Sequence, residues 1–150
     1  MTRVRASVAA VALGLVVAGA GYGIVGGEAS AAGPTPVGPG LVTVTVDIEH
    51  SRFALTTRRV RVGTVVRFVV TNHDPINHEF VVGDASVHAH HVDGTESSHP
   101  PVPGEISVGP DERGVTVMRF ERAGRVEYAC HLPGHLAYGM VGEIVVEPGA

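Results

Sequence analysis

The sequence predicts an all-β domain, a sandwich or barrel of seven or eight short strands that follows an export segment and a linker. Two observations indicate this fold class. From residue 41 onward, short runs of alternating or β-branched residues are separated by glycine and proline. No stretch of this region has the apolar period of a helix. About 110 residues are enough to form one core without disulfides.

The N-terminus has the pattern of an export signal. Residues 1–5 contain two arginines, residues 6–27 carry no charge, and Ala29-Ser30-Ala31 has small residues where a signal peptidase cleaves. We therefore expect residues 1–31 to be an export signal cleaved after Ala31. The uncharged stretch is also about as long as a bilayer span, so an uncleaved membrane anchor is the alternative. In both cases the functional domain is extracytoplasmic: periplasmic, at the cell surface or secreted.

A linker and an acidic domain follow. Residues 32–40 are rich in proline and glycine and bury nothing, so we expect the folded domain over residues 41–150. Without residues 1–31 the chain keeps nine arginines, no lysine and fourteen acidic residues, a net charge of −5. A mildly acidic domain without a basic stripe argues against nucleic acid as a partner. We expect a monomer.

The predicted strands can be placed along the chain in order. Residues 42–48 alternate valine or isoleucine with threonine or aspartate, which is typical of a half-buried strand. Residues 60–62 and 64–71 are rich in β-branched residues, with Gly63 as a turn or bulge between them. The remaining strands are predicted over 79–82, 105–108, 115–120, 125–130 and 142–147.

One short segment after the strand at 125–130 concentrates metal-binding side chains. Cys130, His135 and Met140 have the spacing C-x4-H-x4-M, and Cys130 is the only cysteine. A thiolate, imidazoles and a weak thioether are the ligands of a mononuclear copper electron-transfer site, which needs two histidines. His78, at the start of a predicted strand, is the candidate for the second. Zinc is the competing metal, but one thiolate with a thioether suits copper better.

Two further residues fit this interpretation. An exported protein with one cysteine has a thiol without an internal disulfide partner, and binding a metal as thiolate explains its presence. Phe80 lies two residues after His78, so on a strand both side chains point to the same face. We expect Phe80 to exclude water near the metal, and a core phenylalanine is an equally good and compatible interpretation.

His131 directly follows Cys130, and neighbours on an extended backbone point to opposite faces. We therefore expect it to lie beside the site or on the surface without binding the same ion. A link to a second metal centre is the alternative, although the chain is too short to build such a centre by itself. His50 and His73 are interpreted as ordinary surface residues.

The segment from residue 83 to 103 is rich in histidine and acidic residues. A histidine-rich tract can bind a metal ion, so a second metal site is one hypothesis and a solvated polar insertion is the other. The segment is too long for a hairpin turn and can include a short helix or a lid over a sheet edge. The candidate ligands are His88, His90, His91 and His99.

These residues resemble the cupredoxins, the small blue copper proteins. The resemblance covers roughly residues 41–148, and its specific part is His78-Glu79-Phe80 together with residues 128–135 and Met140. The ligand spacing is more similar to the rusticyanin and sulfocyanin branch than to plastocyanin. The resemblance implies a Greek-key β-sandwich with one type 1 copper, cycling between Cu(I) and Cu(II). The ligands that it implies are His78, Cys130, His135 and axial Met140.

The chain departs from the family pattern at Glu79. Many cupredoxins carry asparagine at this position, and its backbone amide donates a hydrogen bond to the cysteine sulfur. The amide of Glu79 can still serve, but hydrogen bonds around the ligands tune both the reduction potential and the colour.

The resemblance implies one-electron transfer between a redox donor and a redox acceptor, such as a membrane oxidase or a cytochrome. The exposed edge of His135, flanked by apolar loop residues, is the expected electron port. Copper handling (storage, delivery or resistance) is the alternative, and the histidine-rich segment is its support. We expect no enzymatic activity, since one cysteine cannot build a dinuclear thiolate-bridged copper site. The chain also lacks the second domain of a nitrite reductase or multicopper oxidase.

Overall fold

The computed structural model describes residues 34–92, 98 and 100–149, which contain nine strands and two helices. Among these residues, no helix has the length and apolar character needed to cross a membrane. The predicted export segment 1–31 and His99 lie outside the described residues. The elements are β1 Gly40–Ile48, β2 Phe53–Leu55, β3 Arg59–Arg61, β4 Thr64–Asn72, β5 His78–Gly83, α1 Ala85–Val92, β6 Glu105–Val108, β7 Arg113–Arg119, β8 Gly124–Ala129, α2 His135–Tyr138 and β9 Val141–Glu147.

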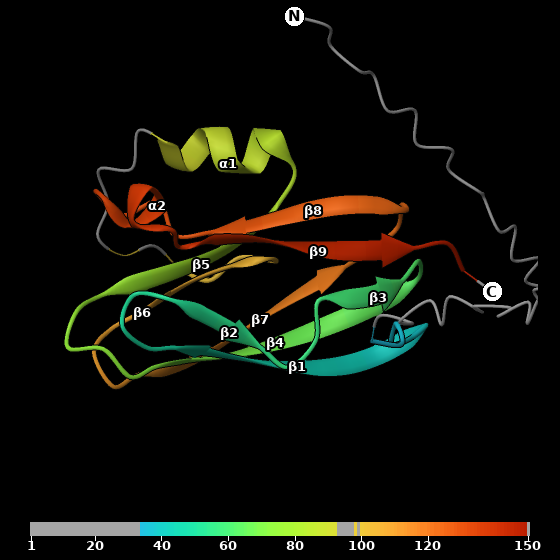
Figure 1. Ribbon diagram of the computed structural model, residues 1–150, viewed down its shortest axis with the longest axis horizontal. Helices are drawn as coiled ribbons and strands as arrows, with labels where there is room; N and C mark the ends of the chain where they lie inside the picture. Colours follow the sequence, from blue (N-terminus) through green and yellow to red (C-terminus); the bar gives the residue numbers. More distant parts are fainter. Residues whose placement is uncertain (1–33, 93–97, 99, 150) are drawn as a thin grey trace, which may run out of the picture. The chain divides into compact units, whose positions relative to one another are not determined.

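The strands form two stacked sheets (Figure 1). One sheet has the order β2-β1-β4-β7 and the other the order β3-β9-β8-β5-β6. β1 runs parallel to β4 and β3 runs parallel to β9, while the other strand pairs are antiparallel. Strands that are distant in sequence are therefore neighbours, as expected for a Greek-key sandwich. The predicted all-β sandwich is confirmed.

The core lies between the two sheets. Alternate residues of β1 point inward, and Val44, Val46 and Ile48 are all buried because the strand period is two. Four aromatic rings meet in the middle. The ring centroid of Phe80 lies 5.1 Å from that of Phe68, 5.5 Å from that of Phe53 and 5.7 Å from that of Tyr128. Burial of these large apolar side chains is the main stabilising contribution of the core.

Sheet register brings the predicted ligands to one end of the sandwich. Ala129 at the end of β8 pairs with Val141 at the start of β9, so the segment between them is a closed loop. β5 runs antiparallel to β8, with Val81 opposite Ala129. The first residues of β5, which begins at His78, therefore lie beside the residues that follow β8.

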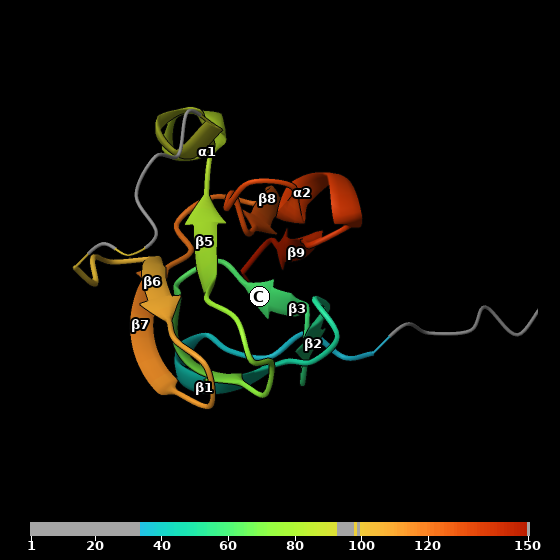
Figure 2. The same cartoon turned by 90° about the vertical axis from the view of Figure 1, so that its left-hand side faces the viewer.

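α1 packs on the outer face of the second sheet, directly after β5 (Figures 1 and 2). The carboxylate of Asp84 accepts hydrogen bonds from the backbone N–H groups of Ser86 and Val87, which caps the helix N-terminus. Gly83 permits the close approach, because a Cβ at this position would lie only 2.7 Å from the side chain of Val87. The short helix considered for the segment 83–103 is thus present.

The bounds of the observed strands differ from those of the predicted strands by at most two residues at either end. Two elements were not predicted from the sequence: β2 and α2. β2 has three residues and lies at the edge of its sheet, and α2 has four residues within the loop between β8 and β9. Both are too short to show a period in the sequence.

Candidate metal centre

Three of the four predicted ligands meet at the end of the sandwich. One ligand atom from each of His78, Cys130 and His135 lies within 4.8 Å of the others. The sulfur of Cys130 is 3.2 Å from Nδ1 of His135, and the imidazole centroids of His78 and His135 are 4.9 Å apart. Over residues 34–92, 98 and 100–149, this is the one group of three such residues at metal-binding separation.

The tautomer of His78 leaves one nitrogen for a metal ion. Its Nε2 lies 2.9 Å from Oδ2 of Asp74, and because a carboxylate only accepts, this nitrogen carries the hydrogen. Nδ1 is buried and has no hydrogen-bond partner among the residues that the structure describes. A buried nitrogen without a partner is costly, and a metal ion at this position would satisfy it. The donor set therefore fits a bound copper ion.

Asp74 is held in place by the neighbouring loop. Its two carboxylate oxygens accept hydrogen bonds from the backbone N–H groups of His50 and Ser51, at 2.7 and 2.8 Å. Burial alone would raise the pKa of Asp74, but these two hydrogen bonds and the contact with His78 bring it below its usual value. Asp74 is therefore an anion that orients His78.

The Cys130 thiol lies in a fully buried position. Burial is the largest effect and raises its pKa from 9.0 to about 11, although hydrogen bonds from the backbone amides of Glu79 and Leu132 favour the thiolate. A metal ion must therefore displace the thiol proton. The amide of Glu79 makes the sulfur hydrogen bond that the family resemblance implies, despite the departure from asparagine.

The side chain of Glu79 has a separate contact. Its Oε1 accepts a hydrogen bond of 2.6 Å from the backbone N–H of His131. Glu79 is only 4% exposed, so this contact ties β5 to the residue after Cys130 inside the protein.

The loop between β8 and β9 is closed by its own backbone. The N–H of Cys130 donates to the carbonyl of Met140 at 3.0 Å, and the N–H of Met140 donates to the carbonyl of His135 at 3.1 Å. Gly134 and Gly139 flank α2 with φ of 87° and 102°, a left-handed conformation that favours glycine. Met140 is fully buried in the same apolar cluster as Cys130.

Burial lowers the pKa of both histidine ligands. For His78 the contact with Asp74 opposes this effect without reversing it. For His135 the neighbouring His78 lowers the pKa further. Both imidazoles are therefore neutral at pH 7, the form that binds metal.

Two residues that position the site were not identified from the sequence. Asp74 lies four residues before His78, and this spacing is too common in sequences to be a signal. Nη1 of Arg52 donates a hydrogen bond of 2.7 Å to the carbonyl of Tyr138, and its guanidinium lies 4.8 Å from the centroid of that ring. Arg52 therefore holds α2 from outside.

The remaining predicted residues lie at different distances from this centre. Phe80 belongs to the aromatic core between the sheets, as the second of its two interpretations predicts.

His131 is buried and contacts His88 on the side away from Cys130. Burial, and then the neighbouring His88 and His91, lower the pKa of His131 to about 4. His90 is exposed on α1, His50 and His73 are exposed as predicted, and His99 lies outside the described residues.

Comparison with known proteins agrees with this geometry. Residues 41–147 match the model of a family described as copper binding proteins of the plastocyanin/azurin family. The chain is 40% identical to a copper-resistant cuproprotein CopI of Rubrivivax gelatinosus, over 63% of this chain and 59% of that protein. It is 30% identical to the protein of the same name from Pseudomonas aeruginosa, over 59% of this chain and 67% of that protein. The chain thus matches about three fifths to two thirds of these relatives.

Solved structures agree in fold. Auracyanin B superposes with a TM-score of 0.54 at 23% identity, over 76% of this chain and 94% of that one. The auracyanin of Roseiflexus castenholzii superposes with a TM-score of 0.55 at 20% identity, over 71% of this chain and 97% of that one. The family match and the assembled donor set lead to the same conclusion: the chain is a copper-binding protein with a cupredoxin fold and belongs to the plastocyanin/azurin family.

Proposed function

We propose that this protein carries single electrons on a type 1 copper held by His78, Cys130, His135 and Met140. The observation that supports this most is the assembled donor set, with the ligand atoms of His78, Cys130 and His135 within 4.8 Å of one another. When bound in such a site, copper supplies a one-electron couple between Cu(I) and Cu(II).

The protein contributes a rigid frame for this couple. One proposed ligand begins β5 and one follows β8. The loop that carries the other two is closed by the hydrogen bond from the Cys130 N–H to the Met140 carbonyl. Asp74 and the Glu79 amide orient His78 and Cys130 from outside the ligand set. Because these contacts are already made, little of the chain must move when the bound copper gains or loses an electron.

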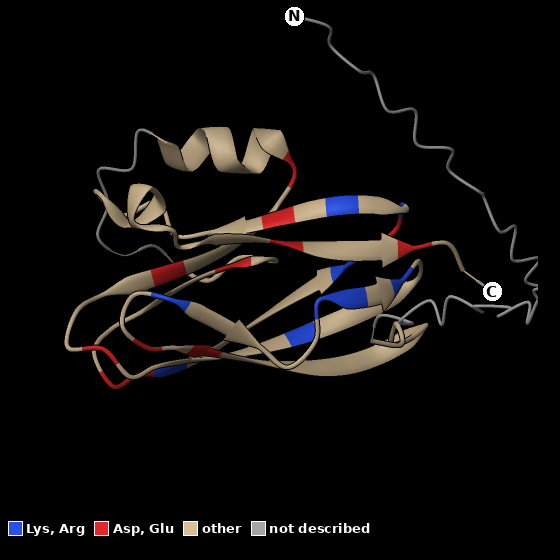
Figure 3. Ribbon diagram, in the orientation of Figure 1, with Lys and Arg blue, Asp and Glu red and all other residues tan. Residues whose placement is uncertain are grey.

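An electron can reach the site through His135. This imidazole is partly exposed, whereas His78 and Cys130 are fully buried. Around it, Leu136 is 41% and Tyr138 is 62% exposed. The loop and α2 carry no Asp, Glu, Lys or Arg of their own (Figure 3), and the guanidinium of Arg52 lies against the Tyr138 ring at the border of this patch. Such a patch suits the small, weak interfaces of redox encounters.

The partners we propose are a redox donor and a redox acceptor, such as a cytochrome or a membrane oxidase. The uncharged N-terminal segment and its small-residue cleavage pattern support an extracytoplasmic location, with a cleaved signal or a membrane anchor. On this proposal the protein acts as a carrier, without a catalytic centre of its own.

Copper handling is the second candidate function. Its support is specific: relatives at 40% and 30% identity are both named copper-resistant cuproproteins. A handling protein must release its copper to an acceptor, whereas a carrier keeps its copper through many redox cycles.

Protein-film voltammetry on the copper-loaded protein separates the two functions, with copper content measured before and after cycling. A carrier gives a reversible one-electron wave and keeps its copper when incubated with an excess of a Cu(I) chelator of moderate affinity. The rate of electron exchange with a small redox protein should fall in Leu136→Asp, because the new carboxylate places a charge on the patch around His135. The rate should not change in Val115→Asp, because Val115 lies on the distant β7. Loss of copper to the chelator on reduction would favour handling and contradict the carrier proposal.

A further inference from the structure

We infer that the chain has a binding site for a small organic carboxylate on the side of the sandwich between β2 and β9. In this site the hydroxyl of Tyr128 and the guanidinium of Arg58 donate hydrogen bonds to the carboxylate. The site goes beyond the electron-transfer function proposed above, and none of the four proposed copper ligands belongs to it.

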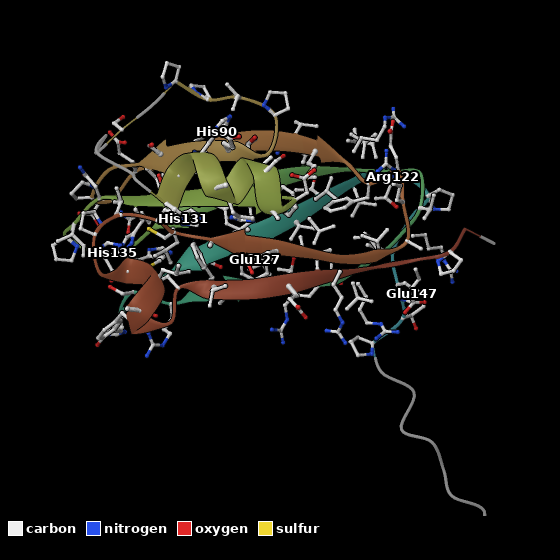
Figure 4. All side chains as sticks on the ribbon, turned by 90° about the horizontal axis from the view of Figure 1, so that it is seen from above. His90, Arg122, Glu127, His131, His135 and Glu147 are labelled. Atoms are coloured by element: carbon white, nitrogen blue, oxygen red, sulfur yellow. The ribbon has the colours of Figure 1, made fainter. Side chains whose placement is uncertain are left out.

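The sheet topology leaves this side of the sandwich open. β2 is an edge strand of the first sheet, and in the second sheet β9 pairs with β3 only over residues 145–147. The beginning of β9 therefore has β8 on one side and none of the described strands on the other. Figure 4 shows the two ends of β9, with His135 close to its start and Glu147 at its end. The open part of β9 thus lies toward the metal centre.

Two adjoining cavities occupy the space between the two edges. One has a volume of about 620 Å³ and reaches from Leu55 of β2 to Gly142 and Val145 of β9. The other has a volume of about 210 Å³ and contains Tyr128 in its wall. Leu55 and Arg58 line both cavities, so one small molecule can extend from one into the other. Small-molecule sites in proteins commonly have volumes of about 300–1,000 Å³.

Gly142 allows the ring of Tyr128 to reach this edge. The two residues are directly opposite each other in the ladder between β8 and β9. A Cβ at Gly142 would lie only 2.3 Å from the hydroxyl oxygen of Tyr128, so the phenol ring crosses the backbone of β9 at this glycine. An edge-to-face contact with Phe53, at 5.7 Å between ring centroids, holds the ring there.

The hydroxyl of Tyr128 is left without a hydrogen bond. Tyr128 is only 3% exposed, and its hydroxyl has no hydrogen-bond partner among the described residues. Buried tyrosine hydroxyls usually have a partner, because an unsatisfied polar group away from water is costly. Since Tyr128 lines the smaller cavity, an acceptor oxygen of a molecule bound there would satisfy the hydroxyl.

The charges around the cavities select an anionic ligand. Three arginines line the larger cavity, Arg58, Arg59 and Arg125, against a single carboxylate, that of Glu143. Arg59 and Arg125 each form an ion pair with a glutamate of β9. Arg58 has no ion pair with a described residue, and it also lines the smaller cavity that contains Tyr128. A guanidinium binds a carboxylate through two parallel hydrogen bonds, so Arg58 suits this ligand group.

The walls of the cavities call for an apolar part in the ligand. Leu55 and Val145 line the larger cavity, and Phe53 and Leu55 line the smaller one. An anion without an apolar part would satisfy the two donors but would leave these side chains uncovered. The chemistry therefore favours a carboxylate on an aromatic or branched aliphatic body.

The test titrates the purified protein with benzoate while its amide resonances are followed by nuclear magnetic resonance. We expect one saturable site, with the largest shifts at Leu55, Arg58 and Gly142. Benzamide, which has the same shape without the charge, and inorganic phosphate, which lacks the apolar body, should each bind at least about tenfold more weakly. The reduced copper-loaded form and the metal-free form are both measured, so the result does not depend on the copper assignment.

Tyr128→Phe and Arg58→Gln should each weaken benzoate binding about tenfold or more, because each removes a hydrogen bond to a charged group. Arg67→Gln is the matched control and should bind like the wild type, since Arg67 is an exposed arginine on β4 without an ion pair to a described residue. Tyr128→Phe should leave the denaturation midpoint of the ligand-free protein unchanged, because its hydroxyl makes no hydrogen bond there.

Several outcomes would overturn the site: no saturable benzoate binding, an affinity that is unchanged in either variant, or an equal loss of affinity in Arg67→Gln. Benzamide binding as tightly as benzoate would reject recognition of the carboxylate, and phosphate binding as tightly would reject the organic ligand. If Tyr128→Phe loses its fold, Arg58→Gln decides, and an unchanged affinity in that variant rejects the site.

Discussion

His78 depends on Asp74, a carboxylate that belongs to no ligand motif. The Asp74–His78 contact of 2.9 Å fixes which nitrogen carries the hydrogen and therefore which one is left for copper. Asp74 itself is fixed by the amides of His50 and Ser51, which come from a loop far away in the sequence. The orientation of His78 toward a copper ion therefore depends on residues of two loops as well as on the ligands themselves.

Asp74→Asn should lower copper affinity by about 10- to 100-fold, because it weakens the hydrogen bond that orients a ligand histidine. The measurement is a competition titration with a copper chelator. Asp47→Asn is the matched control, since Asp47 makes the same kind of contact with His73 at 3.3 Å on the surface. Equal affinity losses in the two variants would contradict the role given to Asp74.

Copper binding should strengthen with pH. Burial raises the pKa of the Cys130 thiol to about 11, whereas burial lowers the pKa values of His78 and His135 below 6.5. Between about pH 7 and pH 9 the histidines are already neutral and the thiol is protonated, so binding releases one proton. The apparent dissociation constant should then fall about tenfold for each unit of rising pH.

The same chelator competition, repeated across this pH range, measures the slope. A dissociation constant that does not change with pH would mean that the Cys130 thiol is already ionised in the metal-free protein, contrary to its burial. Cys130→Ser provides the control, because it has no thiol proton to release.

At the residue scale, the sequence shows the residues of the donor group but not the residues that orient them. Cys130, His135 and Met140 share one short loop, and Cys130 is the only thiol of the chain, so the motif is visible in the sequence. The alternation of side chains along a strand correctly predicted that the side chains of His131 and Cys130 point in opposite directions. It could not show that α1 covers that face and buries His131, because helix packing is a tertiary property.

At the scale of elements, the loop between β8 and β9 is held from outside by Arg52. The guanidinium makes a hydrogen bond to the carbonyl of Tyr138 and stacks over its ring. Arg52 also donates to the carbonyl of Ser51, next to the amides that hold Asp74. One exposed arginine thus connects the loop that holds Asp74 with the loop that carries His135 and Met140.

Arg52→Ala should lower the free energy of unfolding by about 1 kcal/mol, the usual size of an exposed cation–π contact together with one hydrogen bond. Denaturant unfolding of the metal-free protein measures this change, and hydrogen exchange should become faster in α2. Arg125→Ala is the control, because Arg125 makes an exposed ion pair with Glu143 away from this loop. An unchanged exchange rate in α2 would show that Arg52 does not hold the loop.

The longest strands are the elements that the sequence indicates most clearly. β1 and β4 have nine residues each, and their alternation or β-branched content marks them clearly. β2 and α2 have three and four residues and depend on neighbours for their conformation. α1 has a weak apolar face because its inward positions carry histidines, so its presence was inferred only as a way to fill a long connection.

At the scale of the whole molecule, one core supports both stability and the metal centre. Cys130 and Met140 belong to the same buried cluster as the aromatic residues between the sheets. Phe80 lies at its centre, fully buried and in contact with three other rings. The hydrophobic core and two residues of the metal centre therefore belong to one packed cluster.

Phe80→Ala should lower the free energy of unfolding by about 3–5 kcal/mol, because it leaves a cavity among the aromatic rings. Denaturant unfolding of the metal-free protein is the measurement. Val115→Ala on β7, where the valine is 38% exposed, should change the stability by no more than about 0.5 kcal/mol. Similar losses in both variants would contradict the central place of Phe80.

The fold class followed from local pattern, but the pairing of the strands did not. Alternation marks a strand and its buried face, yet it does not say which strand is its neighbour. The parallel pairing of β1 with β4, and the position of β5 beside β8, became visible only in the structure. These long-range pairings bring His78 close to Cys130. The sequence therefore identified His78 as a candidate ligand but could not show how it comes to lie beside Cys130.

The most direct test of the copper assignment is a Cu(II) titration of the protein followed by visible absorption, compared with Cys130→Ser. An intense thiolate-to-copper band that saturates at one equivalent and is absent from Cys130→Ser is the predicted result. Weak bands that are the same in both proteins would contradict it, because the copper would then be bound by histidines without the thiolate.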